Sequence, residues 1–151
     1  MALLCILLII VGVLLNITKG SCKTCPPGWN LIRSNCYYFS TIRENWERSK
    51  ELCAERNGIL VVIKDESEMS SLWTFIQQEA FWIGLRRDPK DIDMWVWTDG
   101  SPLTYSAWYE DEPNNVEKNE HCVETWGAVQ SWNDRPCQEK RNYICRGVWS
   151  C

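Results

Sequence analysis

The spacing of apolar residues changes along this chain, from helix-like towards the middle to strand-like in the second half. Residues 45–56 carry apolar or small side chains every three or four positions, which places Trp46, Leu52 and Cys53 on one face. The pair Asn57-Gly58 that follows is a helix stop signal. The pattern therefore predicts a first amphipathic helix over residues 45–56.

A second helix is predicted to begin shortly after the first one ends. Asp65 has the character of an N-cap residue, and Glu68 stands three positions later, where a capping-box partner is expected. Four apolar residues then follow at i, i+3, i+4 and i+7, which places them on one buried stripe. These residues are Met69, Leu72, Trp73 and Ile76.

Short strands are predicted where apolar, β-branched and aromatic residues occur in runs bounded by turn residues. Pro26-Pro27-Gly28 marks a turn, and a short hairpin is expected between Cys25 and Cys36. Residues 102–119 show no regular pattern, yet their aromatic residues and the flanking cysteines favour an ordered loop. The predicted strands cover residues 36–39, 59–63, 81–85 and 94–97.

Length and composition indicate one domain preceded by a targeting segment. A chain of 151 residues can bury one core, and no internal repeat or Gly/Ser linker divides residues 21–151. Residues 2–15 form an apolar run that is shorter than the roughly 20 residues of a membrane-spanning helix. We therefore predict that residues 1–20 are a secretory signal peptide and that the protein is secreted and extracellular. No Lys or Arg precedes the apolar run, so an uncleaved signal-anchor in a membrane is the alternative.

The cysteine count agrees with an extracellular protein. Nine cysteines are present, and Cys5 would leave with the signal, so an even number of eight would remain for disulfide bonds. A zinc site at Cys22 and Cys25 is disfavoured, because no second pair and no histidine cluster accompanies them. Removing Lys19 would take the formal net charge from −4 to −5, and no basic stripe is present. Nucleic acid is therefore not an expected partner.

The most informative polar pattern lies between residues 112 and 134. Calcium prefers oxygen ligands, and the carboxylates and amides of this segment can supply most of a coordination shell. A cis bond before Pro113 would direct its two neighbours to the same side. By itself, Glu112-Pro113-Asn114 is an ordinary polar turn and Asn133-Asp134 an ordinary helix cap or turn. Their occurrence together, with Cys122 and Cys137 on either side of the second pair, favours a calcium site. The candidate ligands are Glu112, Asn114, Glu120, Asn133 and Asp134.

The same side chains suit a sugar ligand. A hydroxyl that binds calcium through its oxygen can still donate a hydrogen bond to a carboxylate and accept one from an amide. Glu112 with Asn114, and Glu120 with Asn133, form two such donor and acceptor pairs. An enzyme is not expected, because the single His121 lacks a free nucleophile or acid partner and no cofactor motif is present.

Over residues 22–151 the chain resembles the C-type lectin-like domain family, and in particular its mannose-type group, which includes DC-SIGN-like receptors and mannose-binding proteins. The resemblance implies an α+β fold in which two helices pack on antiparallel sheets, with disulfide bonds and a long calcium-binding loop region. The landmarks that carry it are Cys53, Trp82-Ile83-Gly84-Leu85, Glu112-Pro113-Asn114, Glu120-His121-Cys122-Val123, Trp132-Asn133-Asp134, Cys137 and Tyr143-Ile144-Cys145.

In this family Glu-Pro-Asn accompanies mannose-type sugars, whereas Gln-Pro-Asp accompanies galactose. The resemblance therefore implies Ca²⁺ as cofactor and glycans ending in mannose, fucose or N-acetylglucosamine as partners, in innate recognition of microbial or cell surfaces. The implied sugar-binding residues are Glu112, Asn114, Glu120, Asn133 and Asp134, with Val116 against the sugar ring.

An auxiliary calcium site of some family members maps only loosely onto this chain. Its acidic positions fall near Asp88 and Asp91, and His121 stands where an acid is common. Asn115 and Glu120 could still contribute to such a site.

The resemblance also implies how the cysteines pair. The implied disulfides are Cys25-Cys36, Cys53-Cys145, Cys122-Cys137 and Cys22-Cys151. An intermolecular bond through Cys22 or Cys151, which would give a disulfide-linked dimer or oligomer, is the competing pairing for the last of them.

A protein-binding or ice-binding module is the alternative function, because fold does not fix function. Lectin-like natural-killer receptors usually lack the complete calcium set, whereas some fish antifreeze proteins keep both the fold and calcium.

Overall fold

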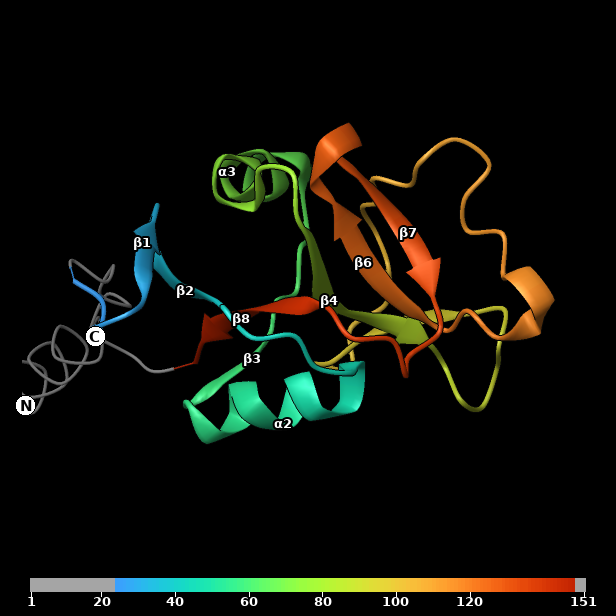
Figure 1. Cartoon of the computed structure of the whole chain (residues 1–151), viewed down its shortest axis with the longest axis horizontal. Helices are drawn as coiled ribbons and strands as arrows, with labels where there is room; N and C mark the ends of the chain where they lie inside the picture. Colours follow the sequence, from blue (N-terminus) through green and yellow to red (C-terminus); the bar gives the residue numbers. More distant parts are fainter. Residues whose placement is uncertain (1–23, 149–151) are drawn as a thin grey trace, which may run out of the picture.

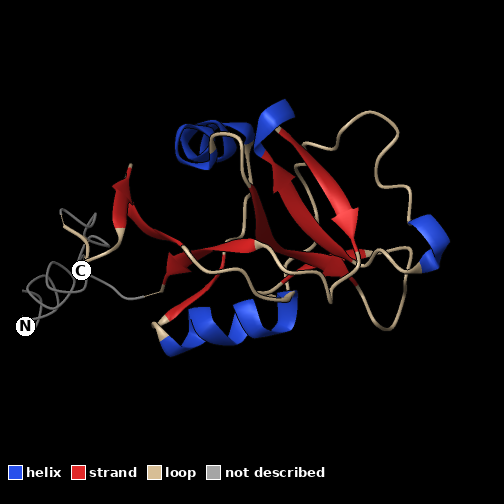
Figure 2. Ribbon diagram, viewed as in Figure 1, coloured by secondary structure: helices blue, strands red, loops and turns tan. Residues whose placement is uncertain are grey.

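Two helices flank a twisted sheet in the computed structural model, which describes residues 24–148 (Figures 1 and 2). The main path of the sheet is β1-β2-β8-β4-β6-β7, with β3 added beside β8 and β5 beside β4. Among the named strands, β4 and β8 pair in parallel and the other pairs are antiparallel. The helices are α2 (Trp46–Glu55) and α3 (Glu66–Ile76); the strands are β1 (Asn30–Ile32), β2 (Asn35–Phe39), β3 (Gly58–Leu60), β4 (Ala80–Arg87), β5 (Trp95–Trp97), β6 (Cys122–Trp126), β7 (Ser131–Arg135) and β8 (Asn142–Gly147); the short 3₁₀ helices are η1 (Val116–Lys118) and η2 (Gly127–Val129).

The first predicted helix is confirmed as α2. The side chain of its N-cap, Asn45, accepts a hydrogen bond from the backbone N–H of Arg48 at 2.9 Å. This bond satisfies one of the free N–H groups of the first turn. Trp46, Leu52 and Cys53 are buried on the predicted face.

The second predicted helix is confirmed as α3, with one change at its start. Asp65 caps it by accepting from the backbone N–H of Glu68 at 2.8 Å. The Glu68 carboxylate does not return to Asp65: it accepts from the backbone N–H of Lys64 at 3.3 Å and from the Tyr37 hydroxyl at 2.7 Å. Three residues of the predicted stripe, Met69, Leu72 and Ile76, are buried, and Trp73 packs half-buried against them.

The predicted strand over residues 59–63 is only partly right. Ladder pairing ends at Leu60, although residues 61–63 are fully buried. Val61 donates its N–H to the carbonyl of Ile144 at 2.9 Å and accepts from the N–H of Gly84 at 2.8 Å. A Cβ at Gly84 would lie 2.7 Å from the Leu60 carbonyl oxygen, so only glycine permits this crossing of the chain over β4.

The other predicted elements are confirmed with small changes in length. The hairpin is β1 with β2, and the turn at Pro26-Pro27-Gly28 is closed by a 3.1 Å bond from Trp29 N–H to the Pro26 carbonyl. The strand predicted over 81–85 extends in both directions as β4, and the one over 94–97 is β5.

The core lies between the helices and the sheet, and tryptophans fill much of it. Trp46, Trp82, Trp97 and Trp132 are buried, as expected for core residues, whereas Trp126 is exposed. The buried indoles keep their N–H groups satisfied: that of Trp46 donates to the Ile83 carbonyl and that of Trp82 to the Glu44 carbonyl. Such bonds fix the orientation of a large ring as well as its burial.

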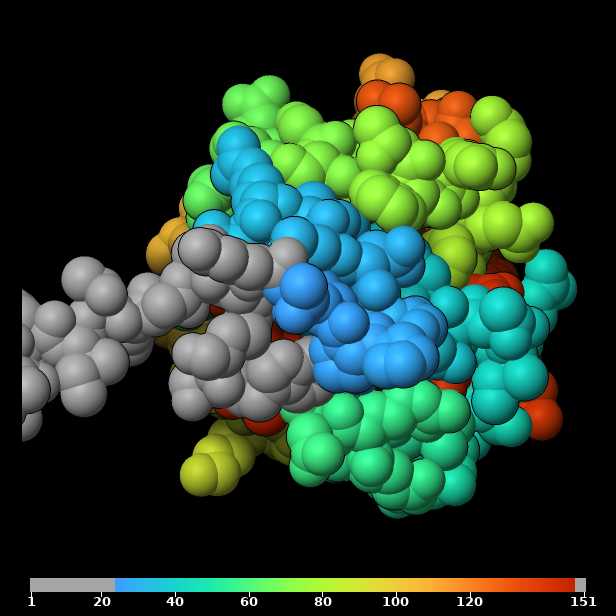
Figure 3. Space-filling model, turned by 90° about the vertical axis from the view of Figure 1, so that its left-hand side faces the viewer, coloured from blue at the N-terminus to red at the C-terminus, as the bar shows by residue number. Residues whose placement is uncertain are grey.

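The β1–β2 hairpin fills the space between the two helices on one face of the molecule (Figure 3). It is tied to α3 by Tyr37, which donates to Glu68, and by a hydrogen bond from Arg33 to Ser67. On the other side the Arg56 guanidinium, just after α2, lies 4.9 Å from the Tyr38 ring centroid.

Three of the predicted disulfides are present, namely Cys25-Cys36, Cys53-Cys145 and Cys122-Cys137. The pairing of Cys22 and Cys151 lies outside the described residues, as does the prediction of a signal peptide over 1–20. No helix within residues 24–148 has the length and apolar composition needed to cross a bilayer.

Candidate functional site

A long loop between β5 and β6 carries most of the candidate site and lies at the end of the domain opposite β1 (Figure 1). The loop is ordered, as predicted, because the backbone joins it to β7: Trp132 N–H donates to the Ala107 carbonyl at 2.6 Å, and Tyr109 N–H donates to the Trp132 carbonyl at 2.9 Å. Tyr105 and Trp108 pack edge-on against the Trp132 ring. The buried tryptophan of β7 therefore anchors the loop.

Glu112 and Asn114 face each other across Pro113. The bond between Glu112 and Pro113 is cis, as the sequence suggested. The side-chain amide of Asn114 donates to Glu112 Oε1 at 2.8 Å, and its backbone N–H donates to Oε2 at 3.1 Å. A carboxylate acceptor and an amide therefore stand together at the surface of the loop.

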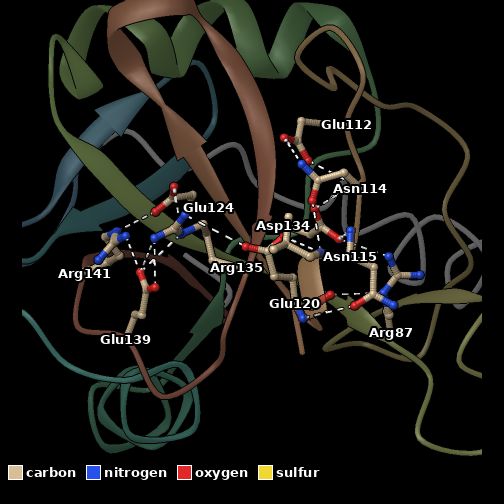
Figure 4. A network of polar contacts seen from close by, with 11 residues as sticks. Arg87, Glu112, Asn114, Asn115, Glu120, Glu124, Asp134, Arg135, Glu139 and Arg141 are labelled. Atoms are coloured by element: carbon tan, nitrogen blue, oxygen red, sulfur yellow. Dashed lines mark hydrogen bonds and ion pairs between the residues drawn. The ribbon is translucent and has the colours of Figure 1, made fainter. Parts of the chain in front are cut away.

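Asp134 joins this turn to the sheet. It lies on β7 with 0% of its surface exposed, and Oδ1 accepts from the N–H of Asn114 at 3.2 Å. Its Oδ2 accepts from the N–H of Asn115 at 3.0 Å and from Arg87 Nη2 at 3.0 Å. Figure 4 shows Asp134 between the turn and Arg87.

Glu120 lies at the far end of the loop, directly before β6. It is buried, and its Oε2 accepts from the N–H of Val116 at 3.0 Å. Its own N–H donates to Asn115 Oδ1 at 3.1 Å. Four of the five predicted calcium ligands are thus linked by direct or shared hydrogen bonds: Glu112, Asn114, Glu120 and Asp134.

Asn133 is the fifth predicted ligand and precedes Asp134 on β7. Its side-chain oxygen, Oδ1, is buried and accepts no hydrogen bond within residues 24–148. Buried amide oxygens are almost always paired, so an unpaired one on the strand that carries Asp134 is a candidate cation ligand. No three His, Cys, Asp or Glu side chains of residues 24–148 form a metal-binding group by themselves. A calcium ion here therefore needs the amide oxygens of Asn114 and Asn133 as well as the carboxylates.

The carboxylates of the site stand close enough to perturb one another. Burial, the hydrogen bond with Asp134, and the negative charges of Asp134 and Glu120 raise the pKa of Glu112 to about 7. Crowded carboxylates disfavour their own ionisation unless a cation balances them. The site is therefore electrostatically suited to a positive ion, and calcium accepts such oxygen ligands.

A second polar network adjoins the site through Arg135 (Figure 4). Arg135 lies 3.9 Å from Glu120 and 2.8 Å from Glu139, and Arg141 bonds the buried Glu124. Burial raises the pKa of Glu124, and the charges of Arg141 and Arg135 oppose that rise.

Sequence reasoning missed Arg87, whose one signal is its place in the pair Arg86-Arg87 that follows the apolar run 81–85. The two acids that map loosely onto an auxiliary calcium site, Asp88 and Asp91, bond to backbone N–H groups of their own turn instead. Asp88 Oδ1 accepts from the N–H of Lys90 at 2.9 Å, and Asp91 Oδ1 accepts from that of Asp93 at 3.2 Å. Both acids therefore cap their own turn.

Comparison with known proteins now identifies the class of protein that this fold and site define. Residues 42–147 match the lectin C-type domain. The chain belongs to the C-type lectin domain family, whose members are non-enzymatic binding modules that typically bind Ca²⁺.

Individual relatives agree with this assignment. The chain is 40% identical over 135 residues to mouse CD209 antigen-like protein C. The alignment covers 86% of this chain and 74% of that protein. The chain spans less than half of two other mouse relatives: 46% of C-type lectin domain family 4 member G and 41% of the low affinity immunoglobulin epsilon Fc receptor.

Solved structures show the same fold. The cow carbohydrate-recognition domain of CD23, determined in the presence of a GlcNAc2Man3 oligosaccharide, aligns with a TM-score of 0.79 and 33% identity over 86% of this chain and 100% of that one. A calcium-independent type II antifreeze protein aligns with a TM-score of 0.73 and 30% identity over 82% and 93% of the two chains.

Proposed function

We propose that this domain binds mannose-type sugars, namely mannose, fucose or N-acetylglucosamine, through a calcium ion. The ion would be held by Glu112, Asn114, Glu120, Asn133 and Asp134. The observation that carries the proposal is the pairing of the Asn114 amide with the Glu112 carboxylate at 2.8 Å, and the unpaired buried oxygen of Asn133 on β7 supports it.

Calcium, when bound, supplies coordination for two adjacent sugar hydroxyls. The protein side chains would form hydrogen bonds with those hydroxyls, both as acceptors and as donors. Glu112 and Glu120 accept from them, while the amides of Asn114 and Asn133 donate to them. Glu112 and Asn114 hydrogen-bond each other, so both reach the same hydroxyl only if their mutual bond opens.

Val116 is the proposed apolar contact to the sugar ring. Its side chain is 52% exposed and sits at the start of η1, two residues beyond Asn114. An apolar contact at this position adds affinity without adding a hydrogen bond.

A site built on a surface loop binds one sugar weakly, on the order of millimolar or about −4 kcal/mol. Capture of a microbial or cell surface therefore needs several sites acting together. We propose a secreted pattern-recognition lectin in innate immunity, and this role is compatible with the similarity to CD209 antigen-like protein C.

The test is retention of the refolded domain on mannose-agarose in millimolar calcium, with galactose-agarose as the matched control. We expect retention on mannose alone and release by chelator. A folded, calcium-binding domain that passes through mannose, fucose and N-acetylglucosamine columns would reject the proposal.

A pair of substitutions tests the basis of sugar selectivity. Exchanging acceptor and amide at the turn, with Glu112→Gln and Asn114→Asp together, reverses the order of donors and acceptors around the Pro113 bond. We expect retention to shift from mannose-agarose towards galactose-agarose with calcium affinity kept within a few-fold. Unchanged mannose retention would show that this turn does not set selectivity.

Ice or protein binding is the second candidate, and the similarity to an antifreeze protein is the observation that favours it. Thermal hysteresis of the same refolded sample, measured with and without chelator, separates the two functions. Ice-growth inhibition without sugar retention would replace the first proposal with this one.

A further inference from the structure

Arg87 places a buried positive charge inside the candidate site. It is the last residue of β4 and only 8% of its surface is exposed. Its Nη2 donates to Asp134 Oδ2 at 3.0 Å, its Nε to the Glu120 carbonyl at 3.1 Å, and its Nη1 to the Ile92 carbonyl at 3.1 Å. The guanidinium carbon also lies 4.4 Å from the Trp95 ring centroid.

These contacts join three separate segments of the chain. Ile92 belongs to the turn after β4, Glu120 ends the long loop, and Asp134 lies on β7. The backbone of Arg87 is itself fixed, because its N–H donates to the His121 carbonyl at 2.8 Å. A guanidinium presents donors in a rigid fork, so one Arg side chain can reach acceptors in three directions, which a lysine ammonium on a flexible stem does less well.

Through Asp134, Arg87 also acts on the turn that carries the sugar-binding pair. Asp134 accepts from the N–H groups of Asn114 and Asn115. The turn is therefore hydrogen-bonded to the same carboxylate that accepts from Arg87. A buried carboxylate without a cationic partner is costly, and the usual consequence is rearrangement or protonation.

Counting lone pairs shows how Arg87 orients Asp134. Oδ2 accepts from Arg87 and from Asn115, which uses both of its lone pairs. Oδ1 accepts from Asn114 and is the carboxylate oxygen that Arg87 does not bond. Arg87 therefore decides which carboxylate oxygen remains available to a metal ion.

We propose that Arg87 is a positioning residue, an internal cation that holds residues 112–120 in their binding-ready arrangement before calcium binds. The inference rests on the proposed function of the site, but it concerns the ion-free domain. Arg87 opposes the mutual repulsion of Glu112, Glu120 and Asp134, which would otherwise push the loop apart in the absence of calcium.

Hydrogen exchange in chelator tests this role directly. In the wild-type domain the N–H groups of Asn114, Asn115 and Val116, which donate to Asp134 and Glu120, are expected to exchange slowly. In Arg87→Gln their exchange is expected to accelerate roughly tenfold or more, while N–H groups of α2 and β2 keep their protection. Arg87→Lys, which keeps the charge but loses the fork, is expected to fall between the two.

Arg86→Gln is the matched control. Arg86 neighbours Arg87 on β4 but bonds Glu47 and lies 5.2 Å from the Trp46 ring centroid, away from the loop. We expect this control to leave exchange at residues 114–116 and the calcium Kd unchanged. For Arg87→Gln we expect the calcium Kd to rise about tenfold, as is common when a residue that orients a metal ligand is lost.

Two results would overturn the inference. One is fast exchange of residues 114–116 in the wild-type domain in chelator; the other is equal protection in wild type and Arg87→Gln. If Arg87→Gln does not fold, Arg87→Lys supplies the same comparison. A wild-type domain that protects these N–H groups through Arg87 but binds no calcium would reject the proposed function and leave the holding role of Arg87 in place.

Discussion

The two ends of this domain are held together by different kinds of interaction. Around α2 and β8, an apolar cluster that includes Trp46, Leu60 and Trp82 surrounds the Cys53-Cys145 disulfide. At the opposite end the long loop hangs on carboxylates, amides and the Arg87 guanidinium (Figure 4). Apolar burial and a covalent bond do not depend on pH or metal ions, whereas charged contacts do. The scaffold around α2 and β8 therefore rests on contacts that need no metal ion, whereas the loop end rests on charged contacts that a bound cation would alter.

Removing one charge from the loop end is expected to have the largest effect. Asp134→Asn keeps the shape of a fully buried side chain but loses its negative charge and one acceptor oxygen. We expect calcium affinity to fall roughly 100-fold, because charge count governs affinity at such sites. Isothermal titration calorimetry measures the affinity, and far-UV circular dichroism checks the fold. Asp111→Asn, at an exposed neighbouring acid, is the control, and an Asp134→Asn Kd within twofold of wild type would contradict the expectation.

Removing each of two disulfides in turn is expected to separate stability from binding. Cys53-Cys145 spans 92 residues and Cys122-Cys137 spans 15. The chain-entropy model assigns them about 4.5 and about 3 kcal/mol of unfolding free energy. Replacing the first pair by alanine should lower the urea midpoint in chelator more, whereas replacing the second should weaken calcium binding more, since it joins β6 to the segment beyond Asp134. Equal loss of calcium affinity in both variants would remove the distinction.

The pH response of the loop end should change sign when calcium is added. Burial and the neighbouring Asp134 raise the pKa of Glu112 from 4.5 to about 7 in the folded domain. Without calcium, the stability contributed by its extra proton is fully present below pH 4.5 and is lost as pH rises through about 7. Calcium requires the ionised carboxylate, so its affinity should fall about tenfold for each pH unit below 7.

Thermal unfolding in chelator and calcium titrations, both between pH 5 and about 8, check these two slopes. Glu112→Gln, which cannot titrate, is the control for the slope in chelator. A wild-type slope in chelator equal to that of Glu112→Gln would show that another group carries the pH response.

The smallest expected effect concerns the sugar alone. Val116→Ala removes part of an exposed apolar side chain and keeps the backbone N–H that donates to Glu120 and Asn114. Mannose affinity should fall about threefold at constant calcium affinity. Val129→Ala, at another exposed valine outside the loop, is the control. Competition with free mannose in calcium measures the change, and a shift in calcium Kd would place Val116 in the ion site instead.

Features with local sequence signals could be predicted. The extent of the helix over residues 45–56, the N-cap Asp65 and the cis bond before Pro113 each depend on a few neighbouring residues, and each is found where expected. The disulfides and the overall fold required the family resemblance, because many pairings of eight cysteines satisfy the same count.

Features that depend on distant partners could not be predicted. Residues 61–63 are as apolar as a buried strand. Ladder pairing nevertheless ends at Leu60, where the chain passes close over Gly84 of β4. Arg87 bonds residues 5, 33 and 47 positions away, so no local pattern shows that its charge is buried. Glu68 likewise bonds Lys64 and Tyr37 instead of the cap residue that a local motif names.

The placement of the long loop opposite β1 sets the direction in which the domain can display a ligand (Figure 1). Residues 24 and 148 lead away from β1 and β8, so a linker joined at either point leaves the residues around Pro113 pointing outward. Copies fixed side by side by such linkers would present their sites in one plane. The spacing of sugars on a facing surface would then matter as much as their identity, because simultaneous contacts raise the effective concentration of each further one.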